Sequence, residues 1–169
     1  MRPELPETID PMRLAKTGKE FSGSYDLHRF ERVNTSSEVS PETQVLFQLE
    51  FSHDNENRLY SIVGSVETSL TQVCQRCMQP MQQQVKGLIK MAIVRDEAKA
   101  EHLPAEFEAF IDTGVPVKLQ DFIEDELLLA MPLVPLHEEQ ECPAADKFRN
   151  EQAAKENPFA ELKNLKLSN

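Results

Sequence analysis

The sequence predicts an α+β fold, built as a mainly antiparallel sheet or small β-barrel with one main helix. Three strand-like runs follow one another with short turns between them, a pattern typical of an antiparallel meander. An amphipathic helix is predicted after them, at about residues 119–131. With 169 residues, of which 40% are hydrophobic, the chain is long enough for one domain with a buried core.

The three predicted strands are recognised by their side-chain pattern. The run "VLFQLEF" (45–51) alternates between two faces, as a half-buried strand requires. The run "LYSIVGSVETSLTQV" (59–73) is rich in β-branched residues, and Gly64 inside it predicts a bulge or sharp bend. The third strand is "QQQVKGLIKMAIV" (82–94).

Two shorter stretches flank this meander. The run "FEAFI" (107–111) predicts a short further strand, whereas "FSGSYDL" (21–27) predicts an irregular turn.

The main helix is predicted from five apolar residues that share one face, and Pro132 ends it. These residues are Leu119, Phe122, Ile123, Leu127 and Ala130. The carboxylates Glu124, Asp125 and Glu126 leave such a helix in different directions, which favours a solvated face over a catalytic pair.

A short helix is predicted near each end of the chain. Near the N-terminus, Asp10 can cap a helix whose first residue is Pro11. At the C-terminus, "NPFAELKNLKL" has apolar residues at helical spacing. We therefore predict a single domain over residues 1–142 with an extended N-terminal arm, and a mobile tail over residues 143–169 that contains the C-terminal helix.

The net charge of −11 is concentrated in one part of the chain. Residues 96–146, called the acidic segment below, carry fourteen acidic and two basic side chains. Such a segment gains little from neutralising phosphates, but it attracts basic partners, and ribosomal proteins are the commonest of these in a bacterial cytoplasm. An acidic surface also keeps a protein soluble without any partner, so both interpretations stay open.

The compartment is predicted from what the sequence lacks. No run approaches the roughly 18 apolar residues of a membrane span. The start of the chain has neither a basic region nor an apolar core of a secretory signal. The three cysteines are an odd number, so we expect a reduced, cytoplasmic protein.

The most specific chemical motif is "VCQRCMQP", with Cys74 and Cys77 at C-x-x-C spacing in the turn between the second and third strands. His137 and Cys142 could complete a Cys3His zinc site. A thiol oxidoreductase is a second interpretation, although no helix is predicted after the motif to lower a thiol pKa. The two thiols could also have a purely structural role in the turn.

The remaining motifs do not predict an enzyme. The chain has only five glycines and none of the glycine-rich phosphate-binding motifs, and its four histidines are scattered. The segment "YDLHRFERV" (25–33) mixes basic and aromatic side chains: Tyr25, His28, Arg29, Phe30 and Arg32. It could contact RNA together with Arg76, or it could be a strand or arm that packs on the core.

Four segments in this order resemble the YceD family, the bacterial large ribosomal RNA subunit accumulation proteins. They are "LPETIDPMRLA", "CQRCMQP", "EDELLLAMPLVPLHEEQEC" and "NPFAELKNLK". The resemblance implies a cytoplasmic protein that supports synthesis, processing or accumulation of 23S ribosomal RNA. The resemblance also implies a difference: family members from other bacteria carry a second cysteine pair where this chain has only His137 and Cys142.

We therefore expect a non-catalytic ribosome-biogenesis factor, with ribosomal or assembly proteins of the large subunit as partners of the acidic segment. A direct binder of ribosomal RNA precursor, and a zinc-stabilised or thiol-redox protein, are the alternatives.

Overall fold

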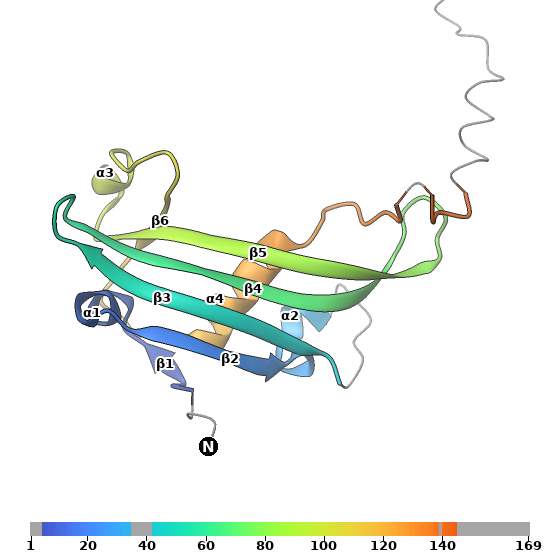
Figure 1. Cartoon of the computed structure of the whole chain (residues 1–169), viewed down its shortest axis with the longest axis horizontal. Helices are drawn as coiled ribbons and strands as arrows, with labels where there is room; N and C mark the ends of the chain where they lie inside the picture. Colours follow the sequence, from blue (N-terminus) through green and yellow to red (C-terminus); the bar gives the residue numbers. More distant parts are fainter. Residues whose placement is uncertain (1–4, 35–41, 139, 145–169) are drawn as a thin grey trace, which may run out of the picture. The chain divides into compact units, whose positions relative to one another are not determined.

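The computed structural model describes residues 5–34, 42–138 and 140–144, which form two compact units (Figure 1). The first, called the sheet unit, comprises Met1–Gln72 and Gln82–Leu133. The second, called the knuckle unit, comprises Val73–Met81 and Val134–Asn169. The predicted C-terminal helix lies outside the described residues, so the predicted tail and domain boundary stay predictions.

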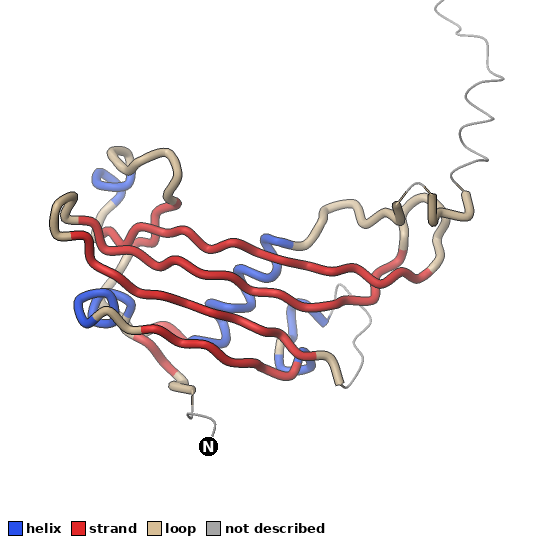
Figure 2. Tube along the Cα trace, viewed as in Figure 1, coloured by secondary structure: helices blue, strands red, loops and turns tan. Residues whose placement is uncertain are grey.

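The predicted α+β fold is confirmed, with an open sheet rather than a closed barrel (Figure 2). Five strands lie in the order β2-β3-β4-β5-β6, so β2 and β6 form its edges. Their bounds are β2 Glu20–Asp26, β3 Gln44–Asp54, β4 Leu59–Val73, β5 Pro80–Val94 and β6 Glu108–Ile111. A second, two-stranded antiparallel sheet pairs β1 (Thr8–Ile9) with β7 (Val117–Lys118).

The predicted meander is β3, β4 and β5. The pairing of β3 with β4 continues through Gly64, which lies opposite Leu49, so the predicted bulge is wrong. Glycine is needed there because a Cβ atom would lie 2.1 Å from the carbonyl oxygen of Gln48. The glycine therefore permits a close backbone approach within a regular ladder.

The prediction of an irregular turn at residues 21–27 is wrong, because most of this stretch belongs to β2. The strand pairs antiparallel with β3, from Glu20 opposite Glu50 to Asp26 opposite Gln44. Its polar, glycine-containing composition has low strand propensity, and pairing with β3 overrides that local preference.

The predicted short strand is confirmed as β6, and it pairs parallel with β5. A parallel partner needs a crossover connection. Here the connection contains the short helix α3 (Glu97–Ala100), which Asp96 caps by accepting a hydrogen bond of 2.9 Å from the backbone N–H of Lys99.

The predicted N-terminal helix is α1 (Pro11–Thr17), with the predicted cap. The backbone N–H of Arg13 donates to Asp10 Oδ1 at 2.9 Å. The helix ends at Gly18, whose φ of 62° is in the left-handed region that glycine adopts without steric cost.

The predicted main helix is α4 (Leu119–Ala130), which lies across one face of the five-stranded sheet (Figure 2). Its side chains Leu119, Ile123 and Leu127 are fully buried against apolar residues of the strands. The 3₁₀ turn η1 (Leu27–Arg29) and helix α2 (Glu31–Asn34) add Leu27, Phe30 and Val33 to the same core. None of the described helices is both long and apolar enough to cross a membrane.

The carboxylate triplet on α4 is not a solvated face. Only Asp125 is exposed, whereas Glu124 and Glu126 are buried. Burying two carboxylates on one helix is costly unless hydrogen bonds or proton uptake compensate for the lost hydration. The two side chains meet this requirement in different ways.

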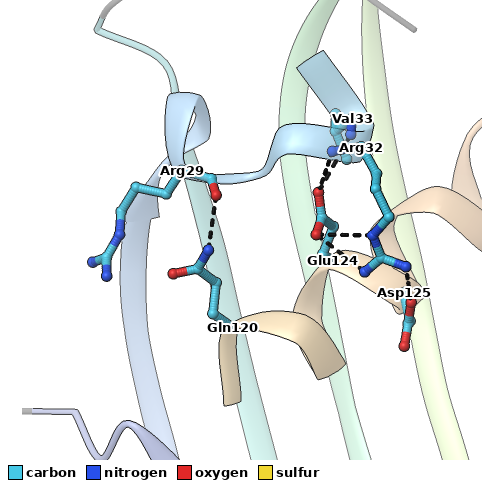
Figure 3. A network of polar contacts seen from close by, with 6 residues as sticks. All are labelled: Arg29, Arg32, Val33, Gln120, Glu124 and Asp125. Carbon is cyan, nitrogen blue, oxygen red and sulfur yellow. Dashed lines mark hydrogen bonds and ion pairs between the residues drawn. The ribbon is translucent and has the colours of Figure 1, made fainter. Parts of the chain in front are cut away.

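Glu124 is satisfied by hydrogen bonds from α2 (Figure 3). Its Oε1 accepts from the backbone N–H groups of Arg32 at 2.8 Å and Val33 at 3.4 Å. Its Oε2 accepts from the Arg32 guanidinium at 3.0 Å. Since α2 follows Phe30, which cannot cap a helix, the Glu124 carboxylate caps α2 from the distant helix α4.

Two further contacts join the same elements (Figure 3). Asp125 forms an ion pair of 2.6 Å with Arg32, and the side-chain amide of Gln120 donates to the carbonyl oxygen of Arg29 at 2.7 Å. Three side chains on two successive turns of α4, Gln120, Glu124 and Asp125, therefore hold η1 and α2 against α4.

Replacing Glu124 should destabilise the fold far more than replacing its neighbour. Glu124→Ala leaves the N–H groups at the start of α2 without their acceptor, at an expected cost of about 2–4 kcal/mol. Asp125→Ala, the matched control, removes an exposed ion pair and should cost less than about 1 kcal/mol. Urea unfolding measures both values, and equal costs would contradict the capping role of Glu124.

No residue in the described part of the chain donates a comparable hydrogen bond to Glu126. The pKa of its carboxyl group is raised to about 7. Burial is the largest cause, and the nearby charges of Glu108 and Asp125 add to it. A side chain with this pKa is partly protonated at neutral pH, which explains how it is accommodated on the buried side of α4.

Stability should therefore depend on pH through Glu126. Between about pH 4.5 and pH 7 the unfolded chain loses the Glu126 proton while the folded chain keeps it, so stability falls as the pH rises. Glu126→Gln should be more stable than the unmodified protein by about 1–2 kcal/mol at pH 8, with little difference at pH 4. Thermal unfolding at the two pH values measures this, and a gain that is independent of pH would contradict the assignment.

Candidate metal centre

The turn between β4 and β5 holds Cys74 and Cys77, at the position predicted from the sequence. The backbone N–H of Cys74 donates to the carbonyl oxygen of Gln79 at 2.9 Å, and that of Met78 donates to the carbonyl oxygen of Cys74 at 2.8 Å. Met78 has φ of 60°, a left-handed conformation for which glycine is the usual residue. These bonds close a tight turn around the two thiols.

The second half of the site comes from residues 135–142. The backbone N–H of Gln75 donates to the carbonyl oxygen of Pro135 at 2.9 Å. Two residues later, the backbone N–H of His137 donates to Cys74 Sγ at 3.4 Å. These two bonds align the extended, proline-containing segment with the cysteine turn inside the knuckle unit.

The four residues predicted as metal ligands, Cys74, Cys77, His137 and Cys142, come together in this unit. One ligand atom from each lies within 4.8 Å of those of the other three. Cys77 Sγ and His137 Nδ1 lie 3.3 Å apart, within hydrogen-bond distance. Sulfur ligands bound tetrahedrally at about 2.3 Å from an ion lie roughly 3.8 Å apart, so the spacing fits a metal ion without a large rearrangement.

The cluster is sheltered but small. Cys74 is fully buried and Cys142 is 6% exposed, while Cys77 and His137 are half-buried. Among residues 42–138 and 140–144, the apolar contacts around it come from Met81 and Ala144. So few apolar neighbours supply little hydrophobic stabilisation, and a bound ion could supply the rest.

The thiols differ in their electrostatic surroundings. Burial raises the pKa of Cys74, but hydrogen bonds from the backbone N–H groups of His137, Cys77 and Arg76 outweigh it and lower the pKa to about 5. For Cys77, burial and the neighbouring thiols Cys74 and Cys142 raise the pKa, against a smaller lowering by Gln79. The geometry thus favours one thiolate at Cys74, the form in which cysteine binds metals.

The same geometry differs from that of a thioredoxin-like redox site. There, C-x-x-C begins a helix whose N-terminus stabilises the thiolate. Here a turn follows Cys74 and strand β5 begins at Pro80. The thiolate is favoured by turn N–H groups instead, which is typical of a metal-binding knuckle.

Sequence reasoning identified all four side chains of the cluster but missed the carbonyl group of Pro135. This group anchors the second half of the site through Gln75. A proline placed two residues before a candidate ligand is a usable signal, because it holds the chain extended there.

The basic and aromatic segment 25–33 packs on the core instead of forming an open patch. Tyr25 stacks on Phe47 with ring centroids 5.5 Å apart, and Phe30 is fully buried. Arg32 is held by Glu124 and Asp125, while the Arg29 guanidinium lies 5.0 Å from the centre of the Tyr25 ring. The arm interpretation therefore describes this segment better than the RNA-contact interpretation.

These features define a class of protein: an α+β protein with an open sheet and a thiol–imidazole knuckle that could hold a metal ion. Residues 62–166 match the family described as "Large ribosomal RNA subunit accumulation protein YceD", and the chain belongs to this family, as its sequence motifs indicate.

A curated relative extends the match to almost the whole chain. The "Large ribosomal RNA subunit accumulation protein YceD" of Haemophilus influenzae is 32% identical over 171 residues, covering 96% of this chain and 97% of the relative. No solved structure matches the chain.

Proposed function

We propose that this protein supports the accumulation of large-subunit ribosomal RNA as a non-catalytic ribosome-biogenesis factor. The observation that carries the proposal is the 32% identity with a relative of that name over nearly the full length of both chains. Similarity over 96% of the chain includes the sheet, α4 and the knuckle, so it concerns the whole described architecture.

The chemistry of the described residues supports a role without catalysis. The most deeply buried carboxylate on α4, Glu124, is fully engaged in capping α2 and is therefore unavailable as a general base. A metal ion held by Cys74, Cys77, His137 and Cys142 would have four protein ligands and no open position for substrate.

The acidic segment is the surface that we propose for contact with a basic ribosomal or assembly protein. Nine of its carboxylates within the described residues are exposed: Asp96, Glu97, Glu101, Glu106, Glu108, Asp121, Asp125, Glu138 and Glu141. Three of these lie beside a cation, in the pairs Lys99–Asp96, Lys90–Glu106 and Arg32–Asp125. The others present negative charge that can attract a basic partner.

Loss of the protein should lower the amount of 23S ribosomal RNA relative to 16S ribosomal RNA. Deleting the gene from its own host and measuring the ratio by electrophoresis of total RNA tests this. Expression of the unmodified chain should restore the ratio. An unchanged ratio after deletion, across growth rates, would overturn the proposal.

The contribution of the acidic segment can be separated in the same strain. Glu97→Gln, Glu101→Gln and Asp121→Gln together remove three exposed charges from the segment. The matched control, Glu20→Gln, Glu42→Gln and Glu56→Gln, removes three exposed charges elsewhere. We expect only the first variant to restore the ratio poorly and to sediment less with large-subunit precursors at low salt, since exposed charges act mainly through screened attraction.

We further propose that the four knuckle ligands hold a structural zinc ion. The support is the thiol-rich, four-ligand set within 4.8 Å, which suits zinc better than the oxygen-preferring cations. A bound ion would join residues 73–81 to residues 134–144, two segments with few apolar contacts of their own.

The purified protein should contain about one zinc ion per chain, as measured by mass spectrometry of the metal. Cys77→Ser should reduce the content to well below half, whereas His28→Ala, at an exposed histidine outside the cluster, should leave it unchanged. Cobalt substitution should give the charge-transfer absorption of thiolate ligands. A protein that neither contains zinc nor binds added zinc or cobalt would refute the site.

A further inference from the structure

A cavity lies at one end of the sheet unit, and its lining residues come from both sides of the cysteine motif in the sequence. It has a volume of about 930 Å³, within the usual range of about 300–1,000 Å³ for ligand pockets. Helix α1, the turn between β3 and β4, and helix α3 gather at this end of the sheet (Figure 1). Its floor is formed by buried residues: Met12, Ser61, Ile93 and Val94.

Exposed cations from four different parts of the sequence line this cavity. Lys16 comes from α1, Arg58 from the β3–β4 turn, Arg95 from the residue after β5 and Lys99 from α3. Among the described residues, Lys16, Arg58 and Arg95 have no carboxylate at ion-pair distance, and Lys99 has one only at 4.0 Å. His102 adds a fifth nitrogen-bearing side chain.

The two carboxylates that line the cavity already have partners. Asp54 accepts hydrogen bonds from the backbone N–H groups of Glu56 and Asn57, and from the Asn57 side-chain amide. Glu106 forms an ion pair of 2.7 Å with Lys90. The cavity is therefore net positive in a chain whose net charge is −11.

A second polar cavity of the sheet unit gives a useful contrast. It contains the cations Arg29, Arg32 and Lys118, but four carboxylates line it as well. Arg32 is committed to two of them. A negatively charged ligand would thus be attracted to the first cavity and not to the second.

Aromatic side chains lie among the cations of the first cavity. Tyr60 lines it and stacks on His53, with centroids 4.0 Å apart and planes 9° from parallel. Phe107 also lines it, beneath the Lys90 ammonium at 4.9 Å. Cations that contact phosphates, next to aromatic rings on which bases stack, form the usual surface for single-stranded nucleic acid.

We propose that this cavity binds a segment of single-stranded RNA. Lys16, Arg58, Arg95 and Lys99 contact its phosphates, and bases pack against Tyr60 and Phe107. Cations contributed by separate elements suit the repeated charges of a strand better than a single phosphate group. The identity of the strand as large-subunit ribosomal RNA rests on the proposed function, whereas the cavity and its charge do not.

The test is fluorescence anisotropy of the full-length protein with a labelled 12-nucleotide single-stranded RNA. Lys16→Gln with Arg95→Gln should weaken binding about tenfold and reduce the slope of log affinity against log salt by about 1.4, at 0.7 for each lost phosphate contact. Arg29→Gln with Lys118→Gln removes the same charge at the second cavity and should change affinity less than about twofold. Thermal unfolding checks that both variants, which alter exposed side chains, remain folded.

A second arm separates RNA from other polyanions. Phe107→Leu should weaken RNA binding about tenfold, as loss of one stacked base predicts, while binding of inorganic polyphosphate is unchanged. Equal losses in the two double variants, no RNA binding at low salt, or polyphosphate binding as tight as RNA binding would each overturn the proposal.

These outcomes are distinguishable from failure of the proposed function. If RNA does not bind but gene deletion still lowers 23S ribosomal RNA, the cavity assignment is wrong and the proposed function stands. If RNA binds at the cavity but deletion leaves the ribosomal RNA ratio unchanged, the cavity assignment stands and the proposed function is wrong.

Discussion

A geometric mismatch between the sheet and its main helix determines much of this structure. Helix α4 has 12 residues and spans about 18 Å, whereas β4 and β5 have 15 residues each and span about 50 Å. One helix cannot cover strands of this length, so α1, η1 and α2 must cover other parts of the apolar face. Because α2 is only one turn long, it depends on the Glu124 carboxylate of α4 for its cap. The long strands also explain why β4 and β5 reach the knuckle unit, where a thiol and imidazole cluster takes the place of a hydrophobic core.

The pattern of neighbouring residues was sufficient to predict the helices and strands that depend mainly on those residues. The alternation of β3, the shared apolar face of α4 and the Asp10 cap of α1 are all properties of adjacent residues. Elements decided by tertiary contact were missed or misassigned. Strand β2 forms because it pairs with the edge of β3, and the residues of "FSGSYDL" show no alternation that would predict a strand. Likewise, the sequence alone suggests that Glu124 and Glu126 are solvated. Glu124 in fact binds Arg32, 92 residues away along the chain, and Glu126 is buried.

The two candidate sites differ in how far the sequence reveals them. Cysteine and histidine are uncommon and chemically specific, so Cys74, Cys77, His137 and Cys142 could be grouped by residue type alone, although about sixty residues separate the halves. Their proximity could not be predicted, since it depends on the backbone bond between Gln75 and Pro135. Lysine and arginine are common, and the cations around the large cavity come from four elements spread between residues 16 and 99. Without the fold, these side chains are indistinguishable from an ordinary solvated surface.

The positions of the charged side chains therefore say more about the binding surfaces of this protein than its net charge does. Of the acidic side chains, Glu124 and Glu126 are buried, and Asp125 and Glu106 are paired, so fewer carboxylates are free to meet a partner than the composition suggests. Helix α3 and the residue after it nevertheless present Glu97 and Glu101, which do not line the cavity that Lys99 lines. Carboxylates and cations so close along the chain would cancel each other at a distance greater than the screening length of about 8 Å in physiological salt. Under the two proposals, recognition would then depend on close contact: a basic protein would meet the exposed carboxylates, and RNA phosphates would meet the cations of the cavity. A factor with two such surfaces could hold a basic protein and an RNA strand together, which is the physical task that assembly of a ribonucleoprotein particle requires.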